Sequence, residues 1–222
     1  MSNCLLCGQA MKNKTRFSDL IFFSKEKSGI CEECFSTFEE IAEQHCPHCY
    51  KNGELESCKD CQYWQNQGKP VVHTALYQYN QAMAHYFSRY KFQGDYVLRN
   101  IFAKKLRIAL SQFPDYTIVP IPISQKRLSE RGFNQVEGLL NATNIPYQSL
   151  LGKYESQKQS SKNRAERLEA KQMFYLLDEK EVPEKILLFD DIYTTGATIQ
   201  LAVELFMKIG RKEIKTFSLI LS

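Results

Sequence analysis

The sequence of 222 residues contains 29 Lys+Arg, 25 Asp+Glu and eight Cys, with 43% hydrophobic and 24% charged residues. This composition is typical of a folded globular protein and argues against a disordered, collagen-like or coiled-coil chain. The sequence has neither the long apolar run of a membrane span nor the basic and apolar regions of a signal peptide, so we expect a cytoplasmic protein with reduced thiols.

Charge and cysteine content divide the chain near Gly68–Pro70. Residues 1–70 carry 8 Lys+Arg, 10 Asp+Glu and every cysteine, whereas residues 71–222 carry 21 Lys+Arg and 15 Asp+Glu. Glycine and proline interrupt regular structure at this point. We therefore expect a small cysteine-rich domain over residues 1–70 and a second domain over residues 71–222.

The cysteines form four Cys-x-x-Cys pairs: Cys4/Cys7, Cys31/Cys34, Cys46/Cys49 and Cys58/Cys61. Two such pairs supply the four thiolates of a tetrahedral structural zinc site, so the sequence predicts two zinc ions. Pairing consecutive pairs gives a double zinc ribbon, which we favour because Cys46–Cys61 is compact enough to close alone. Interleaved pairing stays open. A disulfide framework is disfavoured in the cytosol, and His45 and His48 are not needed as ligands beside eight thiolates.

A basic stretch follows, opposed only by Asp95; its members are Arg89, Lys91, Arg99, Lys104, Lys105 and Arg107. Such a surface attracts phosphates, and we take Arg89, Lys91 and Arg99 as candidate contacts to single-stranded DNA. Aromatic residues that could stack on bases interleave with them: Tyr86, Tyr90, Phe92 and Tyr96. The alternative is a solvated helix face above core aromatics, and charge alone does not decide between the two.

The middle of the chain offers two further candidate ligand loops. Residues 117–122 read as a strand that leads into a loop with Arg127 and Arg131, whose guanidinium groups suit phosphate recognition. Residues 157–167 are polar and basic and contain Arg164 and Arg167. We expect this segment to be a mobile loop that closes over a ligand, with a solvated linker as the alternative.

The sharpest motif lies near the end of the chain. An apolar run, Ile186–Phe189, predicts a buried parallel strand, and helical periodicity begins at Ile199. Between them lie two carboxylates and a threonine-glycine turn: Asp190, Asp191, Thr194, Thr195, Gly196, Ala197 and Thr198. A helix start offers free N–H groups to a phosphate, and carboxylates accept bonds from sugar hydroxyls or approach phosphate-bound Mg²⁺. The motif therefore predicts a site for a ribose 5-phosphate.

These residues resemble the signature of type I phosphoribosyltransferases, which bind phosphoribosyl pyrophosphate (PRPP). The resemblance implies an α/β fold with a parallel sheet flanked by helices, preceded here by the cysteine-rich segment. It places Asp190 and Asp191 at the ribose and residues 194–198 around the 5-phosphate. It also implies that the loop with Arg127 and Arg131 binds pyrophosphate, with Mg²⁺ as a possible cofactor.

The order of motifs resembles the ComF family of competence proteins over nearly the full length. The Cys-x-x-Cys pairs precede Tyr90-Lys91-Phe92-x-Gly94-Asp95, then Arg131-Gly132-Phe133-Asn134-Gln135, then the acidic motif. The resemblance implies a cytosolic role in DNA uptake during natural transformation, with single-stranded DNA and a helicase-like ATPase as partners. One departure is that Ala170 replaces an expected Asn after Arg167, which leaves Arg164 and Arg167 as the candidate phosphate ligands of that loop.

The sequence leaves catalysis open. Purine-salvage enzymes of the phosphoribosyltransferase fold place an acidic residue where Thr194 stands, and no other acid or base is evidently committed to an acceptor. Binding of PRPP or a nucleotide is therefore the main prediction. The alternative is an active phosphoribosyltransferase that transfers ribose 5-phosphate to an unknown acceptor.

Overall fold

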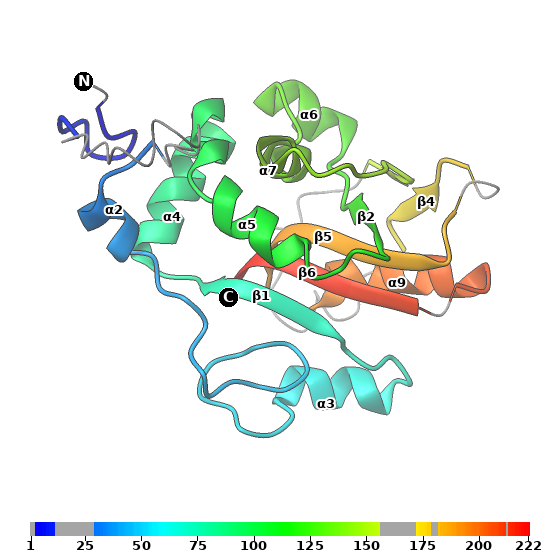
Figure 1. Ribbon diagram of the computed structural model, residues 1–222. Coiled ribbons are helices and arrows are strands. Elements are labelled where there is room, and N and C mark those ends of the chain that lie inside the picture. Colours follow the sequence, from blue (N-terminus) through cyan, green and yellow to red (C-terminus); the bar gives the residue numbers. More distant parts are fainter. Residues whose placement is uncertain (1–2, 12–28, 156–171, 179–181, 212) are drawn as a thin grey trace.

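The computed structural model describes residues 3–11, 29–155, 172–178, 182–211 and 213–222. Its centre is a sheet of four parallel strands in the order β1–β6–β5–β2 (Figure 1). The strands are β1 (His73–Gln78), β2 (Thr117–Pro120), β5 (Lys185–Tyr193) and β6 (Glu213–Leu221). Helices flank this sheet, so the predicted α/β class is confirmed.

The apolar run of β5 explains why it lies inside the sheet. Alternate side chains of a strand point to opposite faces, and both faces of β5 are buried. Leu187 and Phe189 join the core on one face, whereas Ile186 and Leu188 join the core on the other. The two carboxylates therefore come at the end of a strand that is held from both sides.

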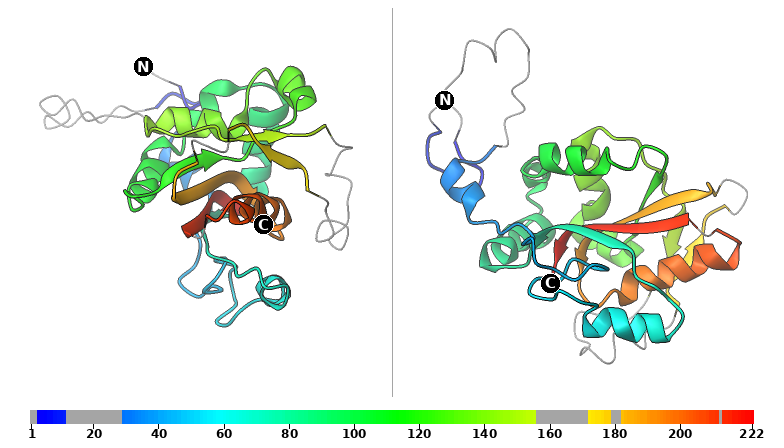
Figure 2. Two further views of the ribbon diagram at one scale, coloured as in Figure 1. Left: turned by 90° about the vertical axis from the view of Figure 1, so that its right-hand side faces the viewer. Right: turned by 60° about the horizontal axis from the view of Figure 1, so that its bottom comes forward.

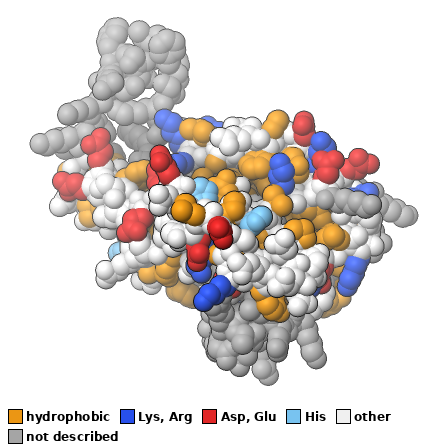
Figure 3. All heavy atoms as spheres, turned by 90° about the horizontal axis from the view of Figure 1, so that it is seen from below, with side chains coloured by type: hydrophobic (Ala, Val, Ile, Leu, Met, Phe, Trp, Pro, Cys, Tyr) orange, Lys and Arg blue, Asp and Glu red, His pale blue; other side chains and the backbone are white. Residues whose placement is uncertain are grey.

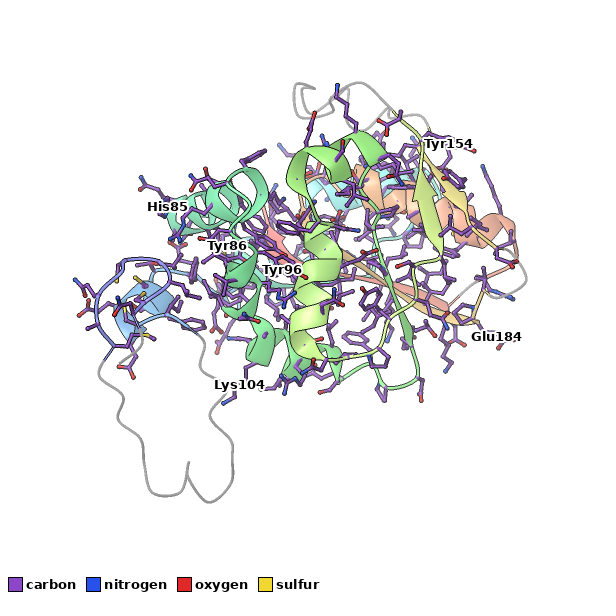
Figure 4. All side chains as sticks on the ribbon, turned by 90° about the horizontal axis from the view of Figure 1, so that it is seen from above. His85, Tyr86, Tyr96, Lys104, Tyr154 and Glu184 are labelled. Carbon is purple, nitrogen blue, oxygen red and sulfur yellow. The ribbon has the colours of Figure 1, made fainter. Side chains whose placement is uncertain are left out.

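One face of the sheet is covered by α4 (Gln81–Phe87), α5 (Ala103–Leu110) and α7 (Gln135–Thr143). Between them run a π-helix, η1 (Ser88–Phe92), and a 3₁₀-helix, η2 (Tyr96–Asn100). Tyr86 and Tyr90 are fully buried in this layer, and Figure 4 shows Tyr86 and Tyr96 directed toward its interior. Tyr86 and Tyr90 are therefore core residues, in agreement with the alternative that these aromatics pack in the core rather than stack on bases.

The opposite face carries α9 (Ala197–Lys208), α3 (Lys59–Asn66) and a two-stranded antiparallel hairpin. The hairpin pairs β3 (Leu151–Lys153) with β4 (Phe174–Leu176). Trp64 of α3 and Phe206 of α9 belong to the same buried cluster. Figure 2 shows α3 beneath the sheet on the side of α9.

The cysteine-rich segment packs directly on the sheet and its helices. After α2 (Glu32–Ser36), the chain runs along the edge strand β1, where the Gln78 N–H donates to Glu39 O at 2.8 Å. The Ile41 N–H likewise donates to Leu76 O at 3.1 Å.

In the described part of the chain, none of the helices is both long enough and apolar enough to cross a membrane.

Candidate functional site

A polar pocket of about 170 Å³ lies at the carboxyl ends of β2 and β5, the edge where open parallel sheets place their ligand sites. Four cationic and two acidic side chains line it: Lys91, Arg127, Arg131, Lys153, Asp190 and Asp191. The excess of positive charge favours an anionic ligand. A larger depression of about 540 Å³ between α2 and α5 is lined mainly by apolar surface, so it offers no comparable anion site.

The two carboxylates close the end of β5. The Asp191 N–H donates to Asp190 Oδ1 at 2.8 Å, and Asp191 Oδ2 forms an ion pair with Lys91 Nζ at 2.6 Å. Burial, and then the charge of Asp191, raise the pKa of Asp190 from 3.8 to about 7. Asp190 thus titrates near neutral pH, and a cation that enters the pocket would favour its charged form.

Lys91 reaches the pocket from the π-helix η1. The buried Tyr90 hydroxyl donates to Gln135 O at 2.9 Å and ties this turn to α7. The Lys91 side chain is 13% exposed, and its Nζ lies 4.2 Å from the centre of the Phe87 ring. π-Turns often occur at functional sites because they redirect a side chain. We predicted Lys91 as a DNA contact, and the structure places it in the pocket, where it pairs with Asp191.

Arg127 and Arg131 lie one turn apart on α6 (Gln125–Arg131), which ends at Gly132 in the left-handed conformation (φ 77°). Arg131 donates to Gln135 Oε1 at 2.7 Å. Burial, and then the neighbouring Arg127, lower the pKa of Arg131. Two guanidinium groups in one pocket suit bidentate recognition of phosphate oxygens.

The threonine-rich turn joins β5 to α9. Thr195 is buried, and among the described residues its hydroxyl has no hydrogen-bond partner. Gly196 has φ 80°, a left-handed conformation that favours glycine. Thr198 lines the pocket, Thr194 is exposed and Ala197 is buried. An unpartnered hydroxyl beside the free N–H groups and positive dipole end of α9 suits an anion.

The eight cysteines form two clusters, each built from consecutive pairs. The first cluster contains Cys4, Cys7, Cys31 and Cys34, and the second contains Cys46, Cys49, Cys58 and Cys61. The sulfur atoms of each cluster lie within 4.8 Å of one another. Four thiols at this separation fit a tetrahedral zinc ion, so the sequential pairing is confirmed and both clusters are compatible with zinc binding.

Both clusters repeat one local geometry. A residue with left-handed backbone follows the first pair of each cluster: Gly8 (φ 74°) and Tyr50 (φ 71°). In each cluster a backbone N–H donates to sulfur at 3.4 Å, from Cys31 to Cys4 Sγ and from Cys58 to Cys46 Sγ. Donors aimed at sulfur stabilise thiolates, which are the form that binds metal. The local backbone is therefore suited to ligation in both clusters.

Two other predicted DNA contacts lie outside the pocket lining. Arg89 donates to the backbone oxygens of Leu5 and Leu6, at 2.7 and 3.2 Å, and pairs with Asp95. Arg99 stacks against the ring of Tyr96, with 3.9 Å between the guanidinium carbon and the ring centre. Arg89 thus links η1 to the first cysteine cluster, and a direct contact of either arginine with DNA stays a prediction.

The predicted site residues did not include two polar residues of the pocket, Lys153 and Gln135. Lys153 comes from the short strand β3, and burial lowers its pKa. Gln135 comes from the start of α7 and accepts the bond from Arg131. Gln135 lies at the end of the Arg-Gly-Phe-Asn-Gln string, which was a signal for it, whereas no local pattern marks Lys153. Arg164 and Arg167 lie outside the described residues.

A parallel sheet flanked by helices, with a threonine-rich turn and a cationic pocket at its carboxyl edge, defines the class: a phosphoribosyltransferase-like α/β protein, preceded by two zinc-ribbon-like cysteine clusters. No family model matches the sequence. The chain is 48% identical over 217 residues to "Competence protein ComFC" of Streptococcus pneumoniae, covering 98% of this chain and 99% of that protein. The chain therefore belongs to the ComFC family of competence proteins.

Two more distant relatives agree. The chain is 32% identical over 228 residues to "Competence protein ComFC" of Bacillus subtilis, with 99% of this chain and 95% of that protein covered. It is 26% identical over 216 residues to "Competence protein F" of Haemophilus influenzae, with 87% and 90% covered. These relationships support a role in competence.

Proposed function

We propose that the pocket binds a phosphorylated ribose, as PRPP or a related nucleotide. Asp190 and Asp191 would accept hydrogen bonds from the ribose hydroxyls, and the turn at Thr195 would hold the 5-phosphate. Arg127 and Arg131 would bind a pyrophosphate group. The observation that carries this proposal is the buried Thr195 hydroxyl, which has no partner among the described residues. It belongs to the turn whose Thr198 lines a pocket with two carboxylates and four cations.

Metal ions complete the proposal in two places. Mg²⁺ carried by the ligand's phosphates would supply charge neutralisation, and the Asp190 and Asp191 carboxylates are the hard oxygen ligands that it prefers. The two cysteine clusters would each bind one structural zinc ion, because every position of a tetrahedral site is filled by sulfur. The chain's own residues then need only orient the sugar and its phosphates.

Calorimetric titration with PRPP, with and without Mg²⁺, tests the pocket. We expect binding by the wild-type protein and none by the double variant Asp190→Ala, Asp191→Ala. Thr195→Val keeps the shape of the side chain but removes the hydroxyl, and it should weaken binding about tenfold or more, since a hydrogen bond to a charged group contributes about 1.5 to 3 kcal/mol.

Glu213→Ala is the matched control, because it removes an exposed carboxyl that pairs with Lys185 far along the strand from the pocket. Its affinity for PRPP should equal that of the wild type. Wild-type protein that gives no heat with PRPP at any Mg²⁺ concentration would contradict the proposal. Circular dichroism confirms that each variant remains folded.

We further infer that the protein acts in the cytoplasm in DNA internalisation, where it handles single-stranded DNA with a helicase-like ATPase. Phe92 supports the DNA part, because its side chain is 75% exposed and its ring lies 5.5 Å from the Arg131 guanidinium, beside the pocket. An exposed aromatic next to bound phosphate offers a stacking surface for a base. The underside of the molecule is less suited to DNA, because acidic and basic side chains intermingle with apolar ones over its described part (Figure 3).

A salt series of single-stranded DNA binding tests this part. Counterion release predicts that affinity falls steeply as salt rises, with a slope of about −0.7 per neutralised phosphate. Neutralising Arg99 should make the salt dependence less steep. Phe92→Ala should weaken binding but leave the steepness of the salt dependence unchanged. Absence of binding at low salt would exclude direct DNA contact. DNA import, measured separately from recombination in cells that carry Asp190→Ala and Asp191→Ala, tests the role of the pocket.

The active enzyme remains the second candidate. Arg127 and Arg131 lie where they could stabilise a departing pyrophosphate. Release of pyrophosphate from PRPP with a panel of nucleobases tests this candidate. Release that depends on one acceptor would support catalysis, and binding without release would favour a phosphoribosyltransferase fold retained for recognition.

A further inference from the structure

The chain's single tryptophan joins the second cysteine cluster to the threonine-rich turn. Trp64 is 4% exposed, and its indole Nε1–H donates to the Thr195 backbone oxygen at 2.7 Å. These residues are 131 positions apart in the sequence. A buried, charge-free hydrogen bond of this length fixes the position of both partners, because a buried donor or acceptor left unpaired is unfavourable.

Trp64 is placed by the cysteine cluster. Helix α3 has Cys58 as its N-cap residue and Cys61 in its first turn, and Trp64 lies three residues after Cys61 on the same helix face. All four sulfur ligands of this cluster are buried in the core that contains Trp64. The direction of α3, and with it the direction of the indole, therefore depends on how the cluster holds the helix start.

A second connection reaches the turn through Tyr193. The His73 backbone N–H donates to the carbonyl oxygen of His48, which lies between Cys46 and Cys49, and the His73 ring stacks on Tyr193 at 4.0 Å. Tyr193 is the last residue of β5, directly before the turn. The cluster is thus connected to the turn at two points, to Thr195 through Trp64 and to Tyr193 through His73.

The turn has little room to move against these residues. A Cβ atom added at Gly196 would lie 2.3 Å from the Tyr193 hydroxyl oxygen and 3.2 Å from Trp64 Nε1. Tyr193 and Trp64 therefore form a wall behind the turn, and neither of them lines the pocket. A small shift of α3 would move this wall and change the direction of the N–H groups that would meet the ligand.

We infer that Trp64 is a positioning residue for the phosphate-binding turn, and that it couples metal binding at the second cysteine cluster to ligand binding in the pocket. This inference rests on the proposed binding of a phosphorylated ribose. Coupling between two sites is reciprocal, so ligand in the pocket must also strengthen metal binding at the cluster by the same factor. The four thiolates of this cluster would hold a zinc ion, which would fix the start of α3.

Trp64→Phe is the first test, because it keeps an aromatic ring and removes only the indole N–H and part of the apolar contact. We expect its affinity for PRPP, measured by calorimetry on protein with two zinc ions per chain, to fall about tenfold. Tyr63→Phe is the matched control on the same helix, since its ring packs edge-on against Trp64 but leaves the bond to Thr195 intact. Its affinity should be unchanged.

Zinc release is the second test, and its main comparison, wild-type protein with and without PRPP, requires no variant. A chromogenic chelator should remove one of the two zinc ions more slowly when PRPP is present, and Trp64→Phe should abolish that difference. Because Trp64 is the only tryptophan, its emission should also shift on addition of PRPP.

The outcomes separate the two proposals. Wild-type protein that fails to bind PRPP overturns the proposed function and the coupling together. Wild-type protein that binds PRPP, with equal affinity in Trp64→Phe and zinc release unaffected by PRPP, overturns the coupling alone. If Trp64→Phe does not fold, zinc release from the wild type decides: slower release with PRPP supports the coupling, and equal release overturns it.

Discussion

The two cysteine clusters share a local geometry but lie on opposite faces of the sheet. The first cluster packs with the core beneath α4, α5 and α7, and of its four cysteines only Cys4 is fully buried while Cys7 is exposed. The second cluster is buried entirely, in the core shared with α9. The same ligation geometry thus serves two surroundings, one partly open to solvent and one enclosed.

This difference shows how a cysteine-rich segment can support a pocket from two sides. The loop of the first cluster accepts hydrogen bonds from Arg89, two residues before Lys91, which pairs with Asp191. The helix of the second cluster holds the turn through Trp64. One cluster therefore backs the basic side of the pocket, and the other backs the threonine-rich turn.

The largest effect we predict is on the enclosed side. Cys61→Ser should lower the free energy of unfolding by about 4 kcal/mol or more, because loss of a buried metal site belongs to the most destabilising class of changes. This corresponds to a fall of roughly 10 °C in the melting temperature for a chain of this size. Urea unfolding and zinc content per chain measure it.

Cys34→Ser is the matched variant in the first cluster, since Cys34 is also the second residue of its pair and is only half-buried. We expect it to lose one zinc ion as well, but with about half the loss of stability, because partly exposed contacts contribute less. Equal losses from the two variants would show that burial does not distinguish the clusters.

Much of the fold could be predicted because its signals are local. The apolar run before Asp190 is short and uninterrupted, as strands buried on both faces require, and it became β5. The helix expected from Ile199 is α9, which begins two residues earlier. Consecutive cysteine pairs close the shortest loops, and the two clusters form in that way.

The site was predictable only in part, because its remaining contacts join distant segments. Lys91 lies in a basic stretch, and nothing in the sequence shows that a π-helical turn directs it to Asp191. Lys153 lies on a three-residue strand, too short for a pattern. The bond from Trp64 to Thr195 has no local signal, since periodicity reports the face of an element and not its partner across the fold.

The next largest effect concerns the basic side. Asp191→Asn should lower the free energy of unfolding by about 3 kcal/mol, because it breaks the ion pair of the largely buried Lys91 ammonium. The exposed fractions of the two side chains, 13% for Lys91 and 8% for Asp191, place this pair inside the protein. Urea unfolding at neutral pH measures the loss.

Asp95→Asn is its control on the side of the first cluster. The Arg89–Asp95 pair is more exposed, at 22% and 25%, and Arg89 keeps its bonds to Leu5 and Leu6. We expect a loss of about 1 kcal/mol or less. A larger loss from Asp95→Asn than from Asp191→Asn would mean that the first cluster, rather than the pocket, fixes the basic side.

The smallest predicted effect isolates the charge of Asp190, which lines the pocket. Its pKa is about 7 in the folded protein and near 3.8 when unfolded, so the folded state binds this proton more tightly and stability falls as pH rises between these values. Asn cannot ionise, so Asp190→Asn should gain stability relative to the wild type by about 1 kcal/mol between pH 6 and pH 8.

Thermal unfolding over this range measures the gain, and pH 6 is the lower limit because acid protonates thiolate ligands and releases metal. The exposed Asp115, changed to Asn, should show no such trend. A difference between Asp190→Asn and wild type that stays constant from pH 6 to pH 8 would mean that Lys91 and Lys153 hold Asp190 charged throughout, and that the pocket meets its ligand with both carboxylates already ionised.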